Sequence, residues 1–296
     1  MKRHTPLRRA IVYGGVFLLA AFLFGPFLLV GTASLVEYGD LLTFPPNWFA
    51  HGVSLGNYEY VLTGQVPQSF LREGGQMMYP SQEVRHFPQS VLNSFSVALA
   101  VMLINLVLGC FAGYAYSRLR FPLYGTTFNF VLFSRLIPTV ALAIPYYLIV
   151  QSAGLLNNPV SLIAIYAVLT LPFTVLLLTL HFRSVPEEVE ESAQVEGASN
   201  LQIMLHITLP LSLPSLIGTG LFAFMLAYSE FLFALLLTTK AERWTMAVNF
   251  GVLVANPDVS WGLLNSCIIM GILPTALLVL PVWRFMVRGL AAGAGR

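Results

Sequence analysis

The chain has 296 residues, of which 57% are hydrophobic and 9% are charged. A soluble domain carries about 25% charged residues, so the composition excludes a chain surrounded mainly by water and predicts an integral membrane protein in a lipid bilayer. The formal net charge of +2 is spread along the chain, which leaves no basic patch for nucleic acid.

Six apolar segments are long enough to cross the hydrocarbon core of a bilayer, which takes about 20 helical residues. They cover residues 11–35, 90–116, 124–150, 160–182, 215–237 and 261–285. Prolines interrupt several of them, which membrane helices tolerate because neighbouring helices and water satisfy the freed backbone groups. The sequence therefore predicts an all-α membrane protein with six transmembrane helices, in a single domain over residues 1–296.

The basic residues next to these segments set the orientation, because cytoplasmic loops are enriched in lysine and arginine. Most of them flank one side, namely Lys2, Arg3, Arg8, Arg9, Arg118, Arg120, Arg183, Arg284, Arg288 and Arg296. We therefore expect both termini and the loop at residues 184–210 in the cytoplasm. Residues 37–89 and 239–260 then form loops outside the cell membrane.

The cytoplasmic loop at residues 184–210 has the pattern of two short helices. Ser184-x-x-Glu187 and Ser199-x-x-Gln202 both fit the capping box that begins a helix. Gly197 between them fits the glycine that ends one. In the second helix, one face at helical spacing carries Leu201, Met204, Leu205 and Thr208.

The composition of this loop suits contact with another protein. Small residues allow a partner backbone to approach closely, and carboxylates beside them can pair with arginine or lysine. The loop supplies both kinds, at Glu190, Glu191, Ser192, Ala193, Glu196, Gly197 and Ala198. From the residues alone two interpretations stay open, a docking surface for a separate ATPase and a solvated amphipathic loop.

The same segment resembles the EAA loop of ABC importer permeases, whose consensus is E-A-A, three residues, G, nine residues, I, one residue, L-P. The matching positions are Glu191, Ala193, Gly197, Ile207, Leu209 and Pro210. Ser192 replaces the first alanine, and Glu196 stands where the sugar-importer branch usually has aspartate. The resemblance implies that residues 184–210 couple the permease to its ATPase.

Other segments are similar to the carbohydrate branch of that family, which contains the maltose-type permeases. They are Asn93-Ser94, the run from Tyr114 to Phe121, and the run from Tyr228 to Phe231, where Trp-Asn-Glu-Phe is common in the family. The resemblance implies the fold of an ABC type I importer permease and a place in the cell (inner) membrane of a bacterium or archaeon. It implies that the chain forms half of the translocation path of a sugar importer.

The resemblance also implies the partners. They are a second permease subunit in a heterodimer, two ATPase subunits and an extracytoplasmic solute-binding protein. No cofactor and no enzymatic activity is expected in this chain, because ATP–Mg binds to the ATPase subunits and the sequence has no G-x-x-x-x-G-K-[ST] phosphate loop. The external loop with Trp244, Met246 and Phe250 matches the family loop that reaches toward the binding protein.

Two charges lie inside expected spans, Arg135 in the third and Glu230 in the fifth. Charged residues inside a membrane are costly and face a bundle interior or a water-filled path. Arg135, Glu230 and Tyr228 are therefore candidates for the translocation path. The alternative is a structural ion pair, between Arg135 and Glu230 or with the second permease.

Other functions are weighed against this one. The alternatives are a permease for a polyol or glycerol phosphate, an ion-driven secondary transporter and a membrane enzyme. A secondary transporter usually has more spans and more intramembrane acids than Glu230 alone. The five histidines lie in loops or at the ends of spans, and no H-E-x-x-H or G-x-S-x-G motif occurs. We expect no catalytic residue and no metal site.

Overall fold

The computed structural model describes residues 6–37, 40–42, 52–67, 70, 81–257 and 259–293. Within these ranges the regular structure is helical and contains no strand, as the sequence predicts. The chain forms two compact parts, which are described separately. The first comprises Met1–Pro88 with Phe250–Ile272, and the second comprises Gln89–Asn249 with Leu273–Arg296.

The first part is organised around the junction between α1 (Pro6–Ser34) and α2 (Gly56–Thr63). Asn57 is buried, and its Nδ2 donates to the carbonyl oxygens of Ser34 at 3.0 Å and Val36 at 3.2 Å. Gly262 makes room for it, since a Cβ there would lie 2.7 Å from Asn57 Nδ2. The segment after α1 therefore folds back onto the end of α1. The remaining short helices of this segment are η1 (Asp40–Leu42) and η3 (Gln82–His86).

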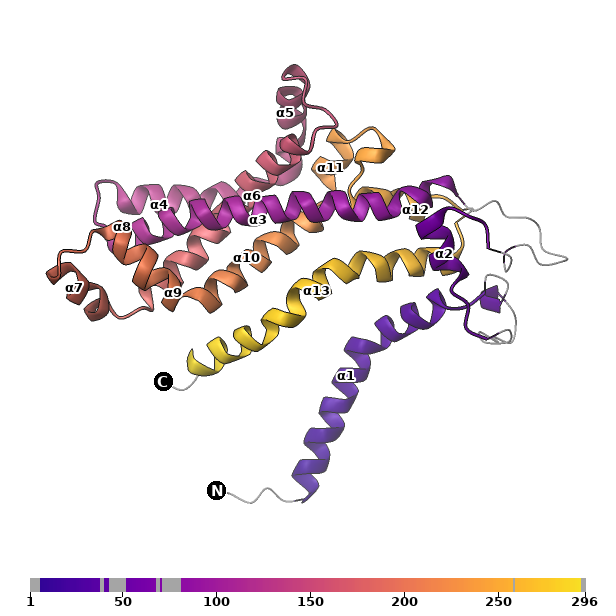
Figure 1. Ribbon diagram of the computed structural model, residues 1–296, viewed down its shortest axis with the longest axis horizontal. Helices are drawn as coiled ribbons and strands as arrows, with labels where there is room; N and C mark the ends of the chain where they lie inside the picture. Colours follow the sequence, from indigo (N-terminus) through magenta and orange to yellow (C-terminus); the bar gives the residue numbers. More distant parts are fainter. Residues whose placement is uncertain are drawn as a thin grey trace. The chain divides into compact units, whose positions relative to one another are not determined.

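The second part is built around three helices that run side by side, α3 (Phe87–Arg118), α6 (Pro159–Arg183) and α10 (Leu213–Tyr228) (Figure 1). Their contact depends on small residues. A Cβ at Gly113 of α3 would lie 3.0 Å from Leu178 Cβ and 3.2 Å from the backbone nitrogen of Thr179 on α6. Glycine at such positions lets membrane helices approach closely.

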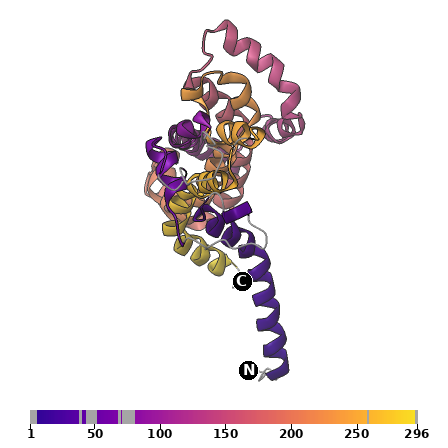
Figure 2. The ribbon, with the colours of Figure 1, turned by 90° about the vertical axis from the view of Figure 1, so that its right-hand side faces the viewer.

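Two of the expected spans are broken. The segment at 124–150 forms α4 (Tyr124–Phe133), η4 (Ser134–Leu136) and α5 (Thr139–Ser152), with a bend of 93°. Pro138 causes the break, because the residue before a proline is pushed out of the helical region, and Ile137 has ψ 120°. As a result α5 projects from the bundle of the second part in both views (Figures 1 and 2).

The segment at 215–237 is likewise divided, into α10 and α11 (Leu232–Leu237). A second bend, of 83°, separates α10 from the residues before it, Asn200–Leu211. Among the described residues four helices are long and apolar enough to span a membrane alone, and six spans result if each bent pair counts as one. The six predicted segments thus all appear as apolar helices, two of them interrupted.

The remaining helices lie at the ends of the bundle or follow it. α7 (Glu187–Val195), α8 (Asn200–Ile203), the π-helical turn η5 (Met204–Thr208) and α9 (Leu209–Leu211) gather at one end of α3, and α11 lies toward the other (Figure 1). The last elements are η6 (Ala241–Arg243), α12 (Met246–Ala255) and α13 (Trp261–Gly293).

Candidate functional site

The first helix of the 184–210 segment begins differently from the prediction. Ser184 does not cap α7, because α6 continues to Arg183 and Ser184 ends it, with its Oγ donating to the carbonyl of His181 at 2.6 Å. Pro186 occupies the N-cap of α7 without a side-chain cap. Glu187 is therefore the first residue of the helix and not the third, so the expected capping box at Ser184 is wrong.

The joint at Gly197 and the start of the second helix are confirmed. Gly197 has φ +89°, its N–H donates to the carbonyl of Gln194 at 2.9 Å, and the Ala198 N–H donates to that of Ala193 at 3.0 Å. This pair of bonds is the Schellman motif that ends a helix. Ser199 and Gln202 then form both bonds of a capping box. The chain therefore reverses sharply between α7 and α8.

The second helix widens into the π-helical turn η5, and the face predicted for it is divided. Met204 and Thr208 are buried, whereas Leu201 and Leu205 are 53% and 47% exposed. On α7, Val195 is likewise exposed, at 90%. An apolar surface of this kind on a polar element is typical of a site that another protein covers.

The residues of the EAA pattern are distributed over this exposed element. Glu191, Ser192, Glu196, Gly197 and Pro210 are exposed. The half-buried positions are Ala193, Ala198, Ile207 and Leu209. Glu190 is the exception, because it is only 3% exposed.

Glu190 is engaged inside the chain on both carboxylate oxygens. Arg118, the last residue of α3, donates from Nε to Oε2 at 2.9 Å, and Thr208 donates from Oγ1 to Oε1 at 2.8 Å. Arg118 also donates from Nη2 to the carbonyl of Val185 at 2.8 Å. Sequence reasoning missed Arg118 and Thr208, since their only signals were a basic residue beside a span and a hydroxyl at helical spacing.

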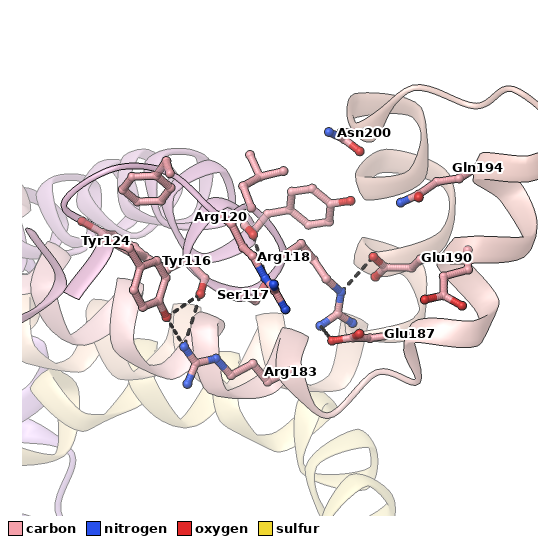
Figure 3. A pocket seen from close by; sticks show the side chains of 14 residues that line it. Tyr116, Ser117, Arg118, Arg120, Tyr124, Arg183, Glu187, Glu190, Gln194 and Asn200 are labelled. Carbon is pink, nitrogen blue, oxygen red and sulfur yellow. Dashed lines mark hydrogen bonds and ion pairs between the residues drawn. The ribbon is translucent and has the colours of Figure 1, made fainter.

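A pocket of about 540 Å³ opens between α7 and the ends of α3 and α6. Figure 3 shows its charged groups, with Arg183 near Tyr116 and Tyr124, and Arg118 facing Glu187 and Glu190 on α7. Arg183 donates to the carbonyl of Tyr116 at 3.3 Å and to the Tyr124 hydroxyl. The arrangement joins α7 and the neighbouring ends of α3 and α6 in one polar region. Among the described residues no group of three His, Cys, Asp or Glu side chains that could hold a metal occurs.

The two intramembrane charges do not pair with each other. Arg135 lies over the ring of Phe173, 4.6 Å from its centre, and donates to the carbonyl of Leu169. Glu230 instead accepts bonds from the backbone N–H groups of Phe233 at 3.1 Å and Ala234 at 3.3 Å. The alternative of an ion pair between Arg135 and Glu230 is therefore not what the structure shows, because each charge bonds to polar backbone beside a helix break or a proline. Tyr228 is buried, with its ring stacked on Phe224 at 5.4 Å.

The loop before α12 is fixed by residues near the start of α3. Asn93 donates to the carbonyls of Glu242 at 2.9 Å and Trp244 at 3.0 Å, and the Met246 N–H donates to Ser94 Oγ at 2.8 Å. Trp244, Met246 and Phe250 are half-buried. The Asn93-Ser94 pair therefore holds Trp244 and the first residue of α12, Met246.

Comparisons with known proteins agree with this architecture. Residues 105–288 match the family described as binding-protein-dependent transport system inner membrane component. A permease of the trehalose/maltose transport system of Thermococcus litoralis is 28% identical over 99% of this chain and 98% of its own length. A permease of the maltodextrin transport system of Bacillus subtilis is 33% identical over 68% of this chain and 73% of its own.

Two further likenesses concern a curated relative and a solved structure. A permease of the sulfoquinovosyl glycerol transport system of Agrobacterium fabrum is 28% identical over 90% of this chain and 87% of its own. The crystal structure of a bacterial ABC transporter involved in the import of the acidic polysaccharide alginate aligns with a TM-score of 0.70 at 19% identity, covering 96% of this chain and 99% of that chain.

The fold is therefore that of an ABC importer permease, and the chain is a multi-pass membrane protein. It belongs to the family of inner membrane components of binding-protein-dependent transport systems. Transport by such a component depends on a solute-binding protein and, in ABC importers, on an ATPase.

Proposed function

We propose that this chain is one permease subunit of a sugar importer and that α7, Gly197 and α8 dock on its ATPase. The single observation that carries the coupling role is the exposed helix–Gly197–helix element at one end of α3, with Glu191, Ser192 and Glu196 on its surface. The relatives compared above belong to transport systems for trehalose and maltose, maltodextrin and sulfoquinovosyl glycerol, which supports a sugar as the substrate of this chain.

The proposed assembly has five or more chains acting together. A second permease forms the other half of the path, two ATPase subunits bind ATP–Mg, and a solute-binding protein delivers the sugar from outside. Both termini and residues 184–210 face the cytoplasm in this proposal, in keeping with the basic residues beside the spans. Residues 1–296 act as one permease domain.

Closure of the ATPase pair on ATP would move α7, and α7 would move the spans. Glu191 and Glu196 are placed to pair with basic residues of the ATPase, while Val195 offers an apolar contact at 90% exposure. Ala193 and Ala198 have small side chains on either side of Gly197, so that a partner backbone can approach closely. The second helix of the element continues toward α10 through η5 and α9, which contain Ile207, Leu209 and Pro210.

The translocation path is proposed to pass the helix breaks that carry Arg135 and Glu230, with Tyr228 beside the second. Broken helices expose backbone polar groups, and transporters use such points to meet a hydrophilic solute. On the outer side, Trp244, Met246 and Phe250 are proposed to contact the solute-binding protein, through the loop that Asn93 and Ser94 hold.

The test is uptake by proteoliposomes that contain the whole complex with its binding protein. Labelled maltose, trehalose and maltodextrin are offered beside sorbitol and glycerol 3-phosphate, with and without ATP inside. ATP-dependent uptake of a saccharide supports the proposal. Uptake confined to sorbitol or glycerol phosphate, or driven by an ion gradient without ATP, overturns it.

The coupling role has its own variants. Gly197→Val forces a β-branched residue to φ +89°, whereas Gly197→Asn substitutes a residue that tolerates positive φ. We expect Gly197→Val to insert normally but to hydrolyse ATP without transport, and Gly197→Asn to stay close to wild type. Wild-type uptake by Gly197→Val would remove the coupling role.

A further inference from the structure

One buried side chain anchors the coupling helix α7 to its own chain. The structure describes all nine residues of α7, and Glu190 is the one that is buried. The neighbouring Glu191 and Val195 face outward. A short amphipathic helix is normally anchored by apolar residues, so a carboxylate in this position calls for a specific reason.

The bonds of Glu190 connect segments that are far apart in sequence. Arg118 ends α3, Thr208 ends the π-helical turn that precedes α10, and Val185 links α6 to α7. Through Arg118 and Glu190, α7 is therefore bonded to the end of α3, to the segment that follows α6, and to the turn that leads through α9 into α10. Figure 3 shows the Arg118 side chain reaching from α3 to α7.

The chemistry of this contact makes it directional. Apolar surfaces can slide past one another, whereas an Arg–carboxylate pair with both oxygens occupied fixes position and angle. The Arg118 and Glu190 side chains are 9% and 4% exposed, so separating them would leave two charges poorly solvated. Displacing α7 alone is thus unfavourable, and α3 and the base of α10 are expected to follow it.

We infer that Arg118, Glu190 and Thr208 form a joint that transmits movement of α7 to α3 and α10. They are positioning residues, because they touch neither ATP nor sugar. The inference rests on the proposed docking of α7 on the ATPase, and it assigns the mechanical link that the exposed EAA residues cannot themselves provide.

The experiment compares Thr208→Val with Thr208→Ser in the complete complex. Valine keeps the shape of threonine and removes the bond to Glu190, whereas serine keeps the hydroxyl. We measure ATP hydrolysis stimulated by the binding protein, and ATP hydrolysed per labelled saccharide transported, in complexes whose subunit content matches wild type. Thr208→Val should raise the ATP consumed per saccharide about 2–10-fold, the factor expected for the net loss of one typical intramolecular hydrogen bond, and Thr208→Ser should keep the wild-type ratio.

Glu190→Gln removes more of the joint. An amide has one acceptor oxygen, so one of the two donors, Arg118 or Thr208, would face an NH₂ group. We expect coupling to fall about 5–150-fold, the usual range for coupling between two sites. Wild-type coupling in Glu190→Gln or Thr208→Val would overturn the inference.

A double variant separates the link from the cost of burying charge. Arg118→Met with Glu190→Leu leaves neither partner unpaired and fills a similar volume, so the complex should assemble. We expect it to remain uncoupled because the directional bond is gone. Full coupling in this double variant would show that only an uncompensated charge mattered, and would overturn the joint.

A separate variant, Glu191→Lys on the exposed side of α7, tests whether α7 docks on the ATPase. If Glu191→Lys keeps wild-type ATPase binding and coupling, the docking proposal is contradicted whatever Glu190 does. If Glu191→Lys loses ATPase binding while Glu190→Gln stays fully coupled, docking stands and the joint alone is wrong.

Discussion

Arg135 lies with Cζ 4.6 Å from the ring centre of Phe173, one residue beyond Pro172 in α6. Its guanidinium also donates to the carbonyl of Leu169, in the turn of α6 that the proline interrupts. A charge that looks like a pathway residue thus has a packing role as well.

Because Arg135 packs on Phe173, substitution of either residue should lower the stability of the fold. Phe173→Leu should lower the free energy of unfolding by about 0.5–2 kcal/mol, the range for a cation–π contact. Arg135→Met should lower it further, because the bond to Leu169 is lost too. Thermal unfolding of the purified complex in detergent measures both. If Arg135→Met unfolds like wild type yet abolishes uptake, Arg135 acts on the solute and not on α6.

Close packing of α3 on α6 predicts a difference between two glycines. Gly113→Ala should lower the free energy of unfolding by about 1–3 kcal/mol, the usual cost of overpacking, because its Cβ would lie 3.2 Å from the backbone nitrogen of Thr179. Gly218→Ala is the matched control, since a Cβ there meets no described atom within 4 Å. Thermal unfolding should show the stability of Gly218→Ala unchanged or slightly increased. Equal losses of stability in Gly113→Ala and Gly218→Ala would contradict this prediction.

The hydrogen bonds of Asn157 predict that the backbone at residues 239 and 240 is locally ordered. It has φ +60°, and its Oδ1 accepts the N–H groups of Thr239 at 2.7 Å and Lys240 at 3.0 Å. Asn157→Ala removes both acceptors and strains the left-handed backbone by about 1–2 kcal/mol. Hydrogen exchange at the amides of 239 and 240 should accelerate, whereas Asn157→Asp should retain protection. Unchanged exchange in Asn157→Ala would show that other contacts hold this loop.

Exposed cations beside that loop predict an electrostatic contribution to binding-protein docking. Lys240 and Arg243 line a pocket of about 480 Å³ together with Asn157, on the side that is proposed to face the binding protein. Arg243→Glu should slow association of the binding protein about tenfold at low salt, with a smaller difference at high salt because the charges are screened. Arg243→Lys keeps the charge and should behave as wild type. Surface plasmon resonance on the reconstituted complex would contradict this if Arg243→Glu associates at the wild-type rate at every salt concentration.

Sequence reasoning located elements whose signals are local. Apolar length placed α1, α3, α6 and α13, and the caps at Gly197 and Ser199 placed the joint of the coupling element. It missed the 93° bend before α5, because proline is tolerated in membrane helices and the pattern does not say whether Pro138 will bend or break one. It also could not bring Arg118 to Glu190, since these residues are 72 positions apart and meet only through the packing of whole helices.

The anchoring of α7 by Glu190 has a consequence for how the complex comes together. Since its bonds come from the same chain, the coupling element has its shape before any ATPase arrives. A surface that is already ordered loses little conformational entropy on association, so more of its contact energy becomes affinity. The permease then offers the ATPase a preformed docking surface. The rate of assembly should be limited by diffusional encounter of the subunits and not by folding at the interface.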